Sequence, residues 1–504
     1  MIELAGALLG NLAQGFGVAM TPVNLGLCLL GCLLGTLVGV LPGIGPTATV
    51  AMLMPITFYL EPTGALIMLA GVFYGSQYGG STTAILVNLP GESSSVVTCL
   101  DGHAMARGGR AGAALAIAAL ASLFAGTVTT LAIAVGGPAI ASVALLFQSP
   151  DYVAVMVLGL VAAIVLAHGS LVKAMAMIVL GVFIGLVGTD VTTGEQRYTF
   201  GIADLYDGVG FVPVAMGLFG LSEIMLNLES RARDGGLARL RDRLWPSRDD
   251  FRSATPATVR GTLLGIVLGI LPGGGSTIPS FAAYSLEKKL ARDPSRFGQG
   301  AVEGVAAPEA ANNAGAQAGF IPMLALGIPP NAIMALLVGA MMIHGIQPGP
   351  QIIAKQPELF WGLVVSMWIG NLMLVVLNLP LIGLWVRLIQ MPYRYLFPAI
   401  IVFCCIGVYS LRNSMMEVVF MAVAGVAGYV LRKLGCEPAP LLLGLILGPM
   451  LEENFRRSLS VSGGDYMIFL QRPISASLLA CAVLLLAFVL LPGVRRQRQR
   501  LRED

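Results

Sequence analysis

The chain has 504 residues, of which 56% are hydrophobic and only 11% are charged, and its mean hydropathy is +0.82. A soluble protein carries roughly 25% charged residues, so this composition excludes a large soluble core and predicts a membrane protein with many spans. At about 20 residues a span, the length predicts about 11–12 transmembrane helices. The net charge of +3 says little, but no lysine or arginine precedes Arg107.

Apolar runs suited to spanning or re-entrant helices lie along both halves of the chain. They occur near residues 24–41, 48–60, 64–88, 111–135, 137–148, 153–167, 171–188, 210–228, 259–271, 277–290, 315–326, 331–346, 358–389, 396–411, 414–431, 439–451 and 474–492. Several are too short to cross roughly 30 Å of hydrocarbon. Irregular backbone at membrane depth is tolerated only inside protein or around a water-filled cavity, so we expect broken helices and re-entrant hairpins.

Two stretches repeat nearly the same sequence, GTLVGVLPGIGPTAT at 35–49 and GIVLGILPGGGSTIPS at 265–280, with Leu41 and Leu271 230 positions apart. Each is an apolar helix-like run that ends in Pro-Gly, followed by small hydroxyl residues. A helix that restarts there exposes free N–H groups, which attract anions. A plain turn between spans explains either copy alone, but recurrence in both halves favours a transporter binding site. The predicted solute-binding residues are Gly43, Gly45, Pro46 and Thr47, with Gly273, Gly275, Ser276 and Thr277.

A second polar stretch runs from Tyr74 to Ser95. Its hydroxyl and amide groups suit carboxylates, whereas hydroxyls and exposed carbonyls suit a hard cation such as sodium. We expect helix N-termini around 81–83 and 93–94; the alternative is that serine and threonine only cap broken helices. The residues predicted to contact solute are Gly80, Ser81, Thr82, Thr83, Pro90, Gly91, Ser93 and Ser94, and those predicted to bind the coupling ion are Asn88 and Pro90.

A third polar stretch lies at 303–313 in the second half. Glu309, Asn312 and Asn313 share one helical face, because they are spaced by three and four residues. Intramembrane carboxylates and amides are costly and usually functional, which makes these three candidates for the coupling-ion site. A cytoplasmic helix cap is the alternative for Glu309. Downstream, the stretch at 326–331 is the analogue of 88–91, with Pro329 a candidate for solute and Gly327 for the ion.

The chain divides into a first half (1–228), a basic linker (229–260), a second half (261–494) and a basic tail (495–504). Under the positive-inside rule the linker and the tail face the cytoplasm. If the halves are inverted repeats, the N-terminus is then periplasmic; parallel repeats are the alternative.

Several motifs of other protein classes are missing. The sequence contains no Walker A motif, no His-Glu-x-x-His pair and no G-x-S-x-G elbow, which argues against an ATPase subunit or an intramembrane hydrolase. No zinc-like spacing of cysteine and histidine occurs. We therefore expect a carrier and no enzyme, cofactor or metal other than a coupling Na⁺ or H⁺. An ion channel or an intramembrane enzyme stays open as an alternative.

Long stretches closely resemble the large membrane subunit of the tripartite tricarboxylate transporters, the TctA family. They are GTLVGVLPGIGPTATVAMLMPITF, YGSQYGGSTTAILVNLPGESSSVVTCLDGHAMARGGRAGAALAIAA, LPGGGSTIPSFAAYSLEKK and FGQGAVEGVAAPEAANNAGAQAGFIPMLALGIPPNAIMALLVGAMMIHGIQPGP. The likeness covers almost the whole chain. One departure is Pro330, where the family usually has glycine; proline removes a backbone N–H and stiffens the second hairpin.

The resemblance implies an all-α secondary transporter of the bacterial inner membrane, built from two inverted repeats and working by an elevator mechanism. It implies symport of a tricarboxylate-like or dicarboxylate-like solute with Na⁺ or H⁺. It also implies two partners, a small TctB-like integral membrane subunit and a TctC-like periplasmic solute-binding protein. Nucleic acid is not an expected partner, and a homo-oligomer is open.

Overall fold

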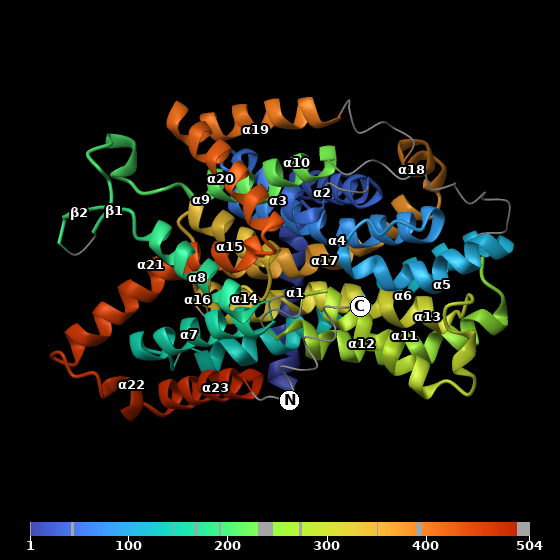
Figure 1. The fold of residues 1–504 in the computed structure, drawn as a ribbon. Coiled ribbons are helices and arrows are strands. Elements are labelled where there is room, and N and C mark those ends of the chain that lie inside the picture. The colour runs from blue at the N-terminus through green and yellow to red at the C-terminus, as the bar shows by residue number, and fades with distance from the viewer. Residues whose placement is uncertain are drawn as a thin grey trace.

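The computed structural model describes residues 2–41, 45–144, 146–166, 170–190, 193–229, 245–271, 275–349, 351–389 and 396–490. These residues form a bundle of helices, with one short two-stranded ribbon at its edge (Figure 1). The predicted all-α class is confirmed. The tail 495–504 and linker residues 230–244 lie outside the described residues.

The helices and strands have the following bounds. They are α1 (Ile2–Ala19), α2 (Pro22–Val40), α3 (Pro46–Thr57), α4 (Pro62–Val87), η1 (Ser93–Ser95), α5 (Val96–Met105), η2 (Ala106–Arg110), α6 (Ala111–Ala144), α7 (Ser149–Leu166), α8 (Leu171–Gly185), β1 (Gly188–Thr189), β2 (Gln196–Arg197), η3 (Ala203–Leu205), α9 (Phe211–Ala215), η4 (Met216–Leu221), α10 (Ser222–Glu229), α11 (Arg248–Gly269), α12 (Thr277–Leu290), η5 (Pro294–Arg296), α13 (Glu303–Ala318), α14 (Phe320–Leu326), α15 (Ala332–Ile343), α16 (Gln351–Lys355), α17 (Pro357–Asn378), α18 (Ile382–Ile389), α19 (Leu396–Arg412), α20 (Met415–Lys433), α21 (Pro438–Val461), α22 (Ile468–Gln471) and α23 (Pro473–Leu490). Helix α11 begins inside the predicted linker, so residues 248–260 are helical.

Two helix pairs, α2 with α4 and α11 with α13, pack in the same way. Glycines spaced by four residues let the two backbones of each pair touch, as is common between helices in membranes. A Cβ at Gly31, Gly35 or Gly39 would overlap a carbonyl oxygen of α4, and one at Gly261, Gly265 or Gly269 would overlap or crowd a carbonyl oxygen of α13. The two sets of glycines are 230 positions apart, the same offset as the repeated Leu-Pro-Gly sequence.

The chain also breaks at matching places in the two halves. Helix α2 stops at Val40 and α3 begins at Pro46, while α11 stops at Gly269 and α12 begins at Thr277. Farther along, Asn88 ends α4 and Gly327 ends α14, both with left-handed backbone (φ 59° and 74°). The same local structure thus appears twice in the chain.

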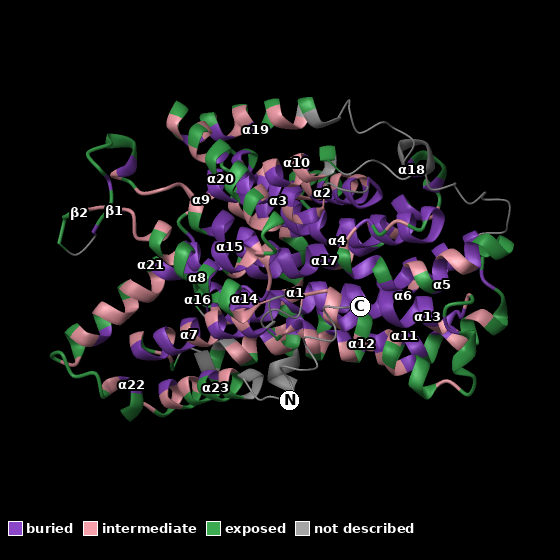
Figure 2. Ribbon diagram, viewed as in Figure 1, coloured by how far each residue is buried: buried purple, intermediate pink, exposed green. Residues whose placement is uncertain are grey.

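The helices at the centre are mostly buried, whereas the outer helices carry many exposed and half-buried residues (Figure 2). Nearly every residue of α4 is buried, but α20 exposes Val419, Val423, Val426 and Val430 along one side. A surface of this kind suits lipid rather than water. By length and composition four helices among the described residues qualify as spans: α2, a continuous helix from Ser93 to Ile140, α17 and α20. Further apolar helices of 10–17 residues accompany them, and the chain is a multi-pass membrane protein.

Candidate functional site

The largest concentration of predicted site residues surrounds one central cavity of about 830 Å³. Four matched segments line it, two from each half: 45–48 and 90–93 from the first, and 275–278 and 329–333 from the second. Residues 435–440, at the start of α21, and single residues of other helices complete the lining. The structure therefore brings together ten residues singled out from the sequence. They are Gly45, Pro46, Thr47, Pro90, Gly91, Ser93, Gly275, Ser276, Thr277 and Pro329.

The N-terminus of α3 meets this cavity. Gly45 is its N-cap with a φ of +26°, a conformation that glycine adopts without strain, and Pro46 fills the first helical position. No side chain caps this end, so backbone N–H groups of the first turn are available to a ligand. The positive end of the helix dipole favours an anion there.

The two halves touch directly at the cavity wall. The hydroxyls of Ser93 and Thr277 are 2.8 Å apart, and the Ser280 hydroxyl donates to the carbonyl oxygen of Ser94 at 2.9 Å. The N-cap of α12, Ser276, makes no capping hydrogen bond of its own. The first turn of α12 is thus held by hydrogen bonds to the first hairpin, and not by a cap within α12 itself.

The two hairpins end in nearly the same backbone conformation but carry different side chains there. Glu92 and Asn331 lie 239 positions apart and have almost equal dihedrals (φ −152°, ψ 169° and φ −151°, ψ 173°). The Asn331 oxygen accepts from the Met334 N–H at 2.9 Å, while its Nδ2 has no partner. An unpaired amide donor beside the cavity suits an acceptor-rich ligand such as a carboxylate.

Charged groups at the cavity were not singled out from the sequence. Among the described residues that line it, one is basic: Arg432, near the end of α20, which pairs with Glu223 and leaves its Nε without a partner. The carboxylate of Glu92 accepts from Gln77 Nε2 at 2.7 Å and from the Ser94 hydroxyl at 2.6 Å. The repeated hairpin could have pointed to Glu92 and Asn331, but no sequence pattern marks Arg432.

Some predicted residues do not reach the cavity. Helix α4 runs unbroken from 62 to 87, so the expected helix N-terminus at Ser81–Thr83 is wrong; Gly80, Ser81, Thr82 and Thr83 are buried within it. Its glycines allow close packing rather than a break, because a Cβ at Gly79 would overlap the carbonyl oxygen of Thr36. The Ser94 side chain is buried and bonds to Glu92 and Gln77. Gly43 and Gly273 lie outside the described residues.

The predicted ion-site residues occupy separate places. Asn88 is exposed, Pro90 lines the central cavity, and Gly327 lines a second cavity. The other three, Glu309, Asn312 and Asn313, are fully buried in the middle of α13. A cytoplasmic cap is thereby excluded for Glu309.

Buried hydroxyls surround the Glu309 carboxylate. It accepts from Ser81 Oγ at 2.5 Å and from the Thr98 hydroxyl. The Asn313 amide donates to Ser122 Oγ at 2.6 Å, while neither polar atom of Asn312 has a partner. Within the described part of the chain no group of three His, Cys, Asp or Glu side chains is placed to hold a metal ion.

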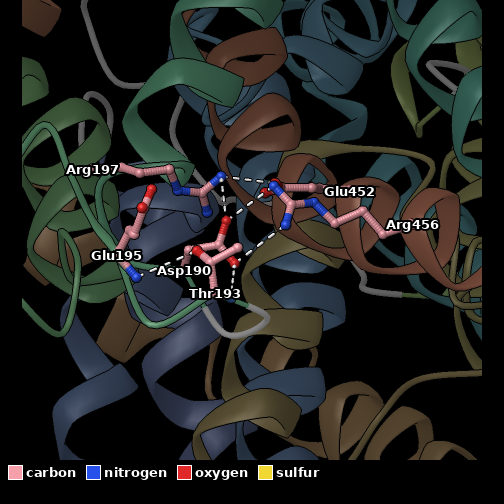
Figure 3. A network of polar contacts seen from close by, with 6 residues as sticks. All are labelled: Asp190, Thr193, Glu195, Arg197, Glu452 and Arg456. Atoms are coloured by element: carbon pink, nitrogen blue, oxygen red, sulfur yellow. Dashed lines mark hydrogen bonds and ion pairs between the residues drawn. The ribbon is translucent and has the colours of Figure 1, made fainter.

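The second cavity, of about 960 Å³, lies on the other side of the hairpin at 327–331. Its wall includes four charged side chains that join the β1–β2 ribbon to α21 (Figure 3). Arg456 contacts Asp190 at 3.0 Å and Glu452 at 2.7 Å, and Arg197 contacts Glu452 at 2.7 Å. The hydrogen bond from Arg197 to Glu452 raises the pKa of Arg197, and these ion pairs join the ribbon to α21.

Comparison with known proteins identifies the family. The model of the tripartite tricarboxylate transporter TctA family matches residues 25–443. An Agrobacterium vitis protein named "Uncharacterized 52.8 kDa protein in TAR-I ttuC' 3'region" is 57% identical over 494 residues, covering 98% of both chains. A second, "Uncharacterized protein in TAR-II ttuC' 3'region" of the same organism, is 56% identical over 236 residues, covering 47% of this chain and 98% of its own length. No solved structure matches.

Proposed function

Since the chain belongs to the tripartite tricarboxylate transporter TctA family, we propose that it is the large membrane subunit of a secondary transporter that imports a carboxylate solute. The observation that carries this proposal is the central cavity, to which each half contributes a broken helix and a hairpin. Its volume of about 830 Å³ falls within the usual range for small-molecule sites, roughly 300–1,000 Å³.

Several donors in the wall suit an anion, and three acidic side chains, Glu92, Glu223 and Glu437, line the cavity as well. The uncapped N-terminus of α3, the free Nδ2 of Asn331 and the Arg432 guanidinium all offer donors. Carboxylates accept hydrogen bonds without donating any, so donors from several elements fit a solute with more than one carboxylate.

We also infer that the halves are inverted repeats. Helix α2 runs alongside α17 in the same direction, since Cys28 lies against Ser366 and Thr36 against Asn378. Helix α6 runs opposite to α17, since Gly126 lies against Asn371 and Gly137 against Phe360. Helix α13 runs with α6, since Asn313 bonds to Ser122 and Gln317 lies against Thr130, and α11 runs with α13. The two Gly-faced helices α2 and α11 therefore run in opposite directions. Movement of one bundle past the other, an elevator, would give alternating access.

The orientation follows from charge. The basic linker and tail are proposed to lie in the cytoplasm and the N-terminus in the periplasm of the bacterial inner membrane. Lys433 pairs with Glu229, the first residue of the linker, and its neighbour Arg432 lines the central cavity. The cavity thus lies toward the linker face, which corresponds to a cytoplasm-facing state.

The coupling ion and partners complete the proposal. Glu309 is the proposed coupling carboxylate, with Na⁺ or H⁺ as the ion. A TctB-like small membrane subunit and a TctC-like periplasmic solute-binding protein are the proposed partners, as the tripartite family implies.

Uptake by reconstituted vesicles tests the function. Vesicles containing the chain, the small subunit and the binding protein should accumulate radiolabelled citrate or another di- or tricarboxylate only under an inward Na⁺ or H⁺ gradient. Glu309→Gln should abolish accumulation while leaving membrane insertion intact. Discrete currents without solute, or covalent change of the solute, would instead support a channel or an enzyme.

A further inference from the structure

A small space among buried residues lies at the Glu309 carboxylate. Its volume is about 10 Å³, close to the minimum of roughly 10–15 Å³ needed for one water molecule. Four helices enclose it, α4, α6, α13 and α17. Its oxygen-bearing lining residues are Tyr78, Ser81, Thr82, Ser122, Glu309 and Asn378.

Asn378 supplies an unpaired oxygen to this space. Its Nδ2 donates to the carbonyl oxygen of Leu374 at 2.9 Å and contacts Thr36 Oγ1 at 3.3 Å. Because a carbonyl can only accept, these bonds fix the amide orientation. The Asn378 Oδ1 is therefore left without a partner, although the residue is only 4% exposed. A buried acceptor of this kind needs a positive ligand or a donor.

The charge of the lining is also unbalanced. Among the described residues that line the space, Glu309 is the single charged side chain, and none is lysine, arginine or histidine. An isolated carboxylate in a membrane interior is strongly disfavoured unless it is neutralised. One monovalent cation would balance it, whereas a divalent ion would leave an excess charge and usually requires several carboxylates.

We propose that this space binds one dehydrated Na⁺, held by the Glu309 carboxylate, the Asn378 carbonyl oxygen and the hydroxyls of Ser81 and Ser122. This rests on the proposed transport function and sharpens it: the coupling ion occupies a buried site between α4, α6, α13 and α17, which shares no lining residue with the central cavity. All the ligands are oxygens, which hard cations prefer. The small volume favours Na⁺ over the larger K⁺.

Ion-dependent stability of the purified full-length protein tests the site without any solute or partner. Sodium that binds the folded state raises its melting temperature in a saturable way. The melting temperature should rise with NaCl and not with KCl or choline chloride at equal ionic strength. Glu309→Gln should remove the sodium-dependent rise.

Two further variants remove one ligand each. Asn378→Leu and Ser122→Ala should raise the sodium concentration for the half-maximal effect by about tenfold or more, a usual loss when a supporting metal contact is removed. Ser366→Ala is the matched control, since this buried hydroxyl of α17 bonds to Leu363 and does not line the space. Its sodium response should equal that of the parent protein.

The sodium site is overturned if Na⁺ and K⁺ act alike on the parent protein, or if Glu309→Gln keeps the full sodium response. Carboxylate uptake driven by a pH gradient alone, with no sodium effect on melting, would overturn the site and leave the proposed transport function standing. If the parent protein shows no carboxylate uptake but its melting temperature still rises with sodium, the transport function is contradicted instead.

Discussion

The hairpins at 88–92 and 327–331 have the same backbone shape but different surroundings. In the first, Gly91 is pressed against the backbone of α2 and α4, and Glu92 is tied to Gln77 and Ser94. In the second, Pro330 and Asn331 line the cavity, and the Asn331 amide has a free donor. Both hairpins line the cavity, but the comparison indicates that the first is anchored by packing, whereas the second offers the solute a free donor.

The largest effect is expected at Gly91. A Cβ there would overlap the Gly39 carbonyl oxygen and crowd the Gly80 Cα, and neither backbone can move away easily. Gly91→Ala should destabilise the protein by roughly 3 kcal/mol, the upper end for overpacking, and abolish uptake. Thermal melting and vesicle uptake measure this. Pro330→Ala, at the equivalent position, should retain the parent's melting temperature; equal damage at both positions would refute the comparison.

A smaller effect is expected at Asn331, where capping and solute binding can be separated. Asn331→Asp keeps the oxygen that caps α15 but replaces the free donor with a negative charge. The KM for the carboxylate should rise at least about tenfold, which corresponds to about 1.4 kcal/mol, with an unchanged melting temperature. Asn331→Leu should lose about 1 kcal/mol of stability as well, because the cap is gone. An unchanged KM in Asn331→Asp would remove this residue from the site.

Arg432 tests whether charge near the second hairpin matters. Arg432→Gln should raise KM severalfold, since one positive charge leaves the cavity, but it also leaves Glu223 unpaired. The double variant Arg432→Gln, Glu223→Gln removes that unpaired charge. If the double variant regains the parent's melting temperature but keeps a high KM, Arg432 binds the solute. If its KM also returns to the parent's value, the role of Arg432 is structural.

The smallest effect is expected at the contact between the halves. Ser93→Ala removes the hydrogen bond to Thr277, which is exposed and worth about 1 kcal/mol or less. Initial uptake rates should fall by about half or less. Loss of uptake comparable to that of Gly91→Ala would mean that this contact, and not the anchoring of Gly91, holds the first hairpin.

Much of the fold could be predicted because apolar runs and repeated breaks are local patterns. The Leu-Pro-Gly repeat located two of the four cavity segments, and the Pro-containing hairpins located the other two. The mistake at Ser81–Thr83 has a physical cause: glycines that break a helix and glycines that allow two helices to touch look alike in sequence. Gly79 and Gly80 are of the second kind.

Other features depend on long-range packing. Arg432 reaches the cavity because α20 ends beside it, and Asn378 lines the same small space as Glu309 because α17 packs on α2 and α4. Neither residue belongs to a motif. Glu309 could be singled out as a costly intramembrane acid, but its hydroxyl partners on α4 and α5 become visible only in three dimensions.

The central claim is that turns from both halves hold one solute. Its most direct test is protection of single cysteines, Thr47→Cys from the first half and Thr277→Cys from the second, against a thiol reagent. The background should have all seven native cysteines replaced by serine, because Cys436 also lines the cavity and Cys481 is exposed. We predict that a transported carboxylate, with citrate tried first, slows labelling at both positions and not at Tyr466→Cys on the exposed surface. Protection of one position without the other, or of neither, would contradict the account.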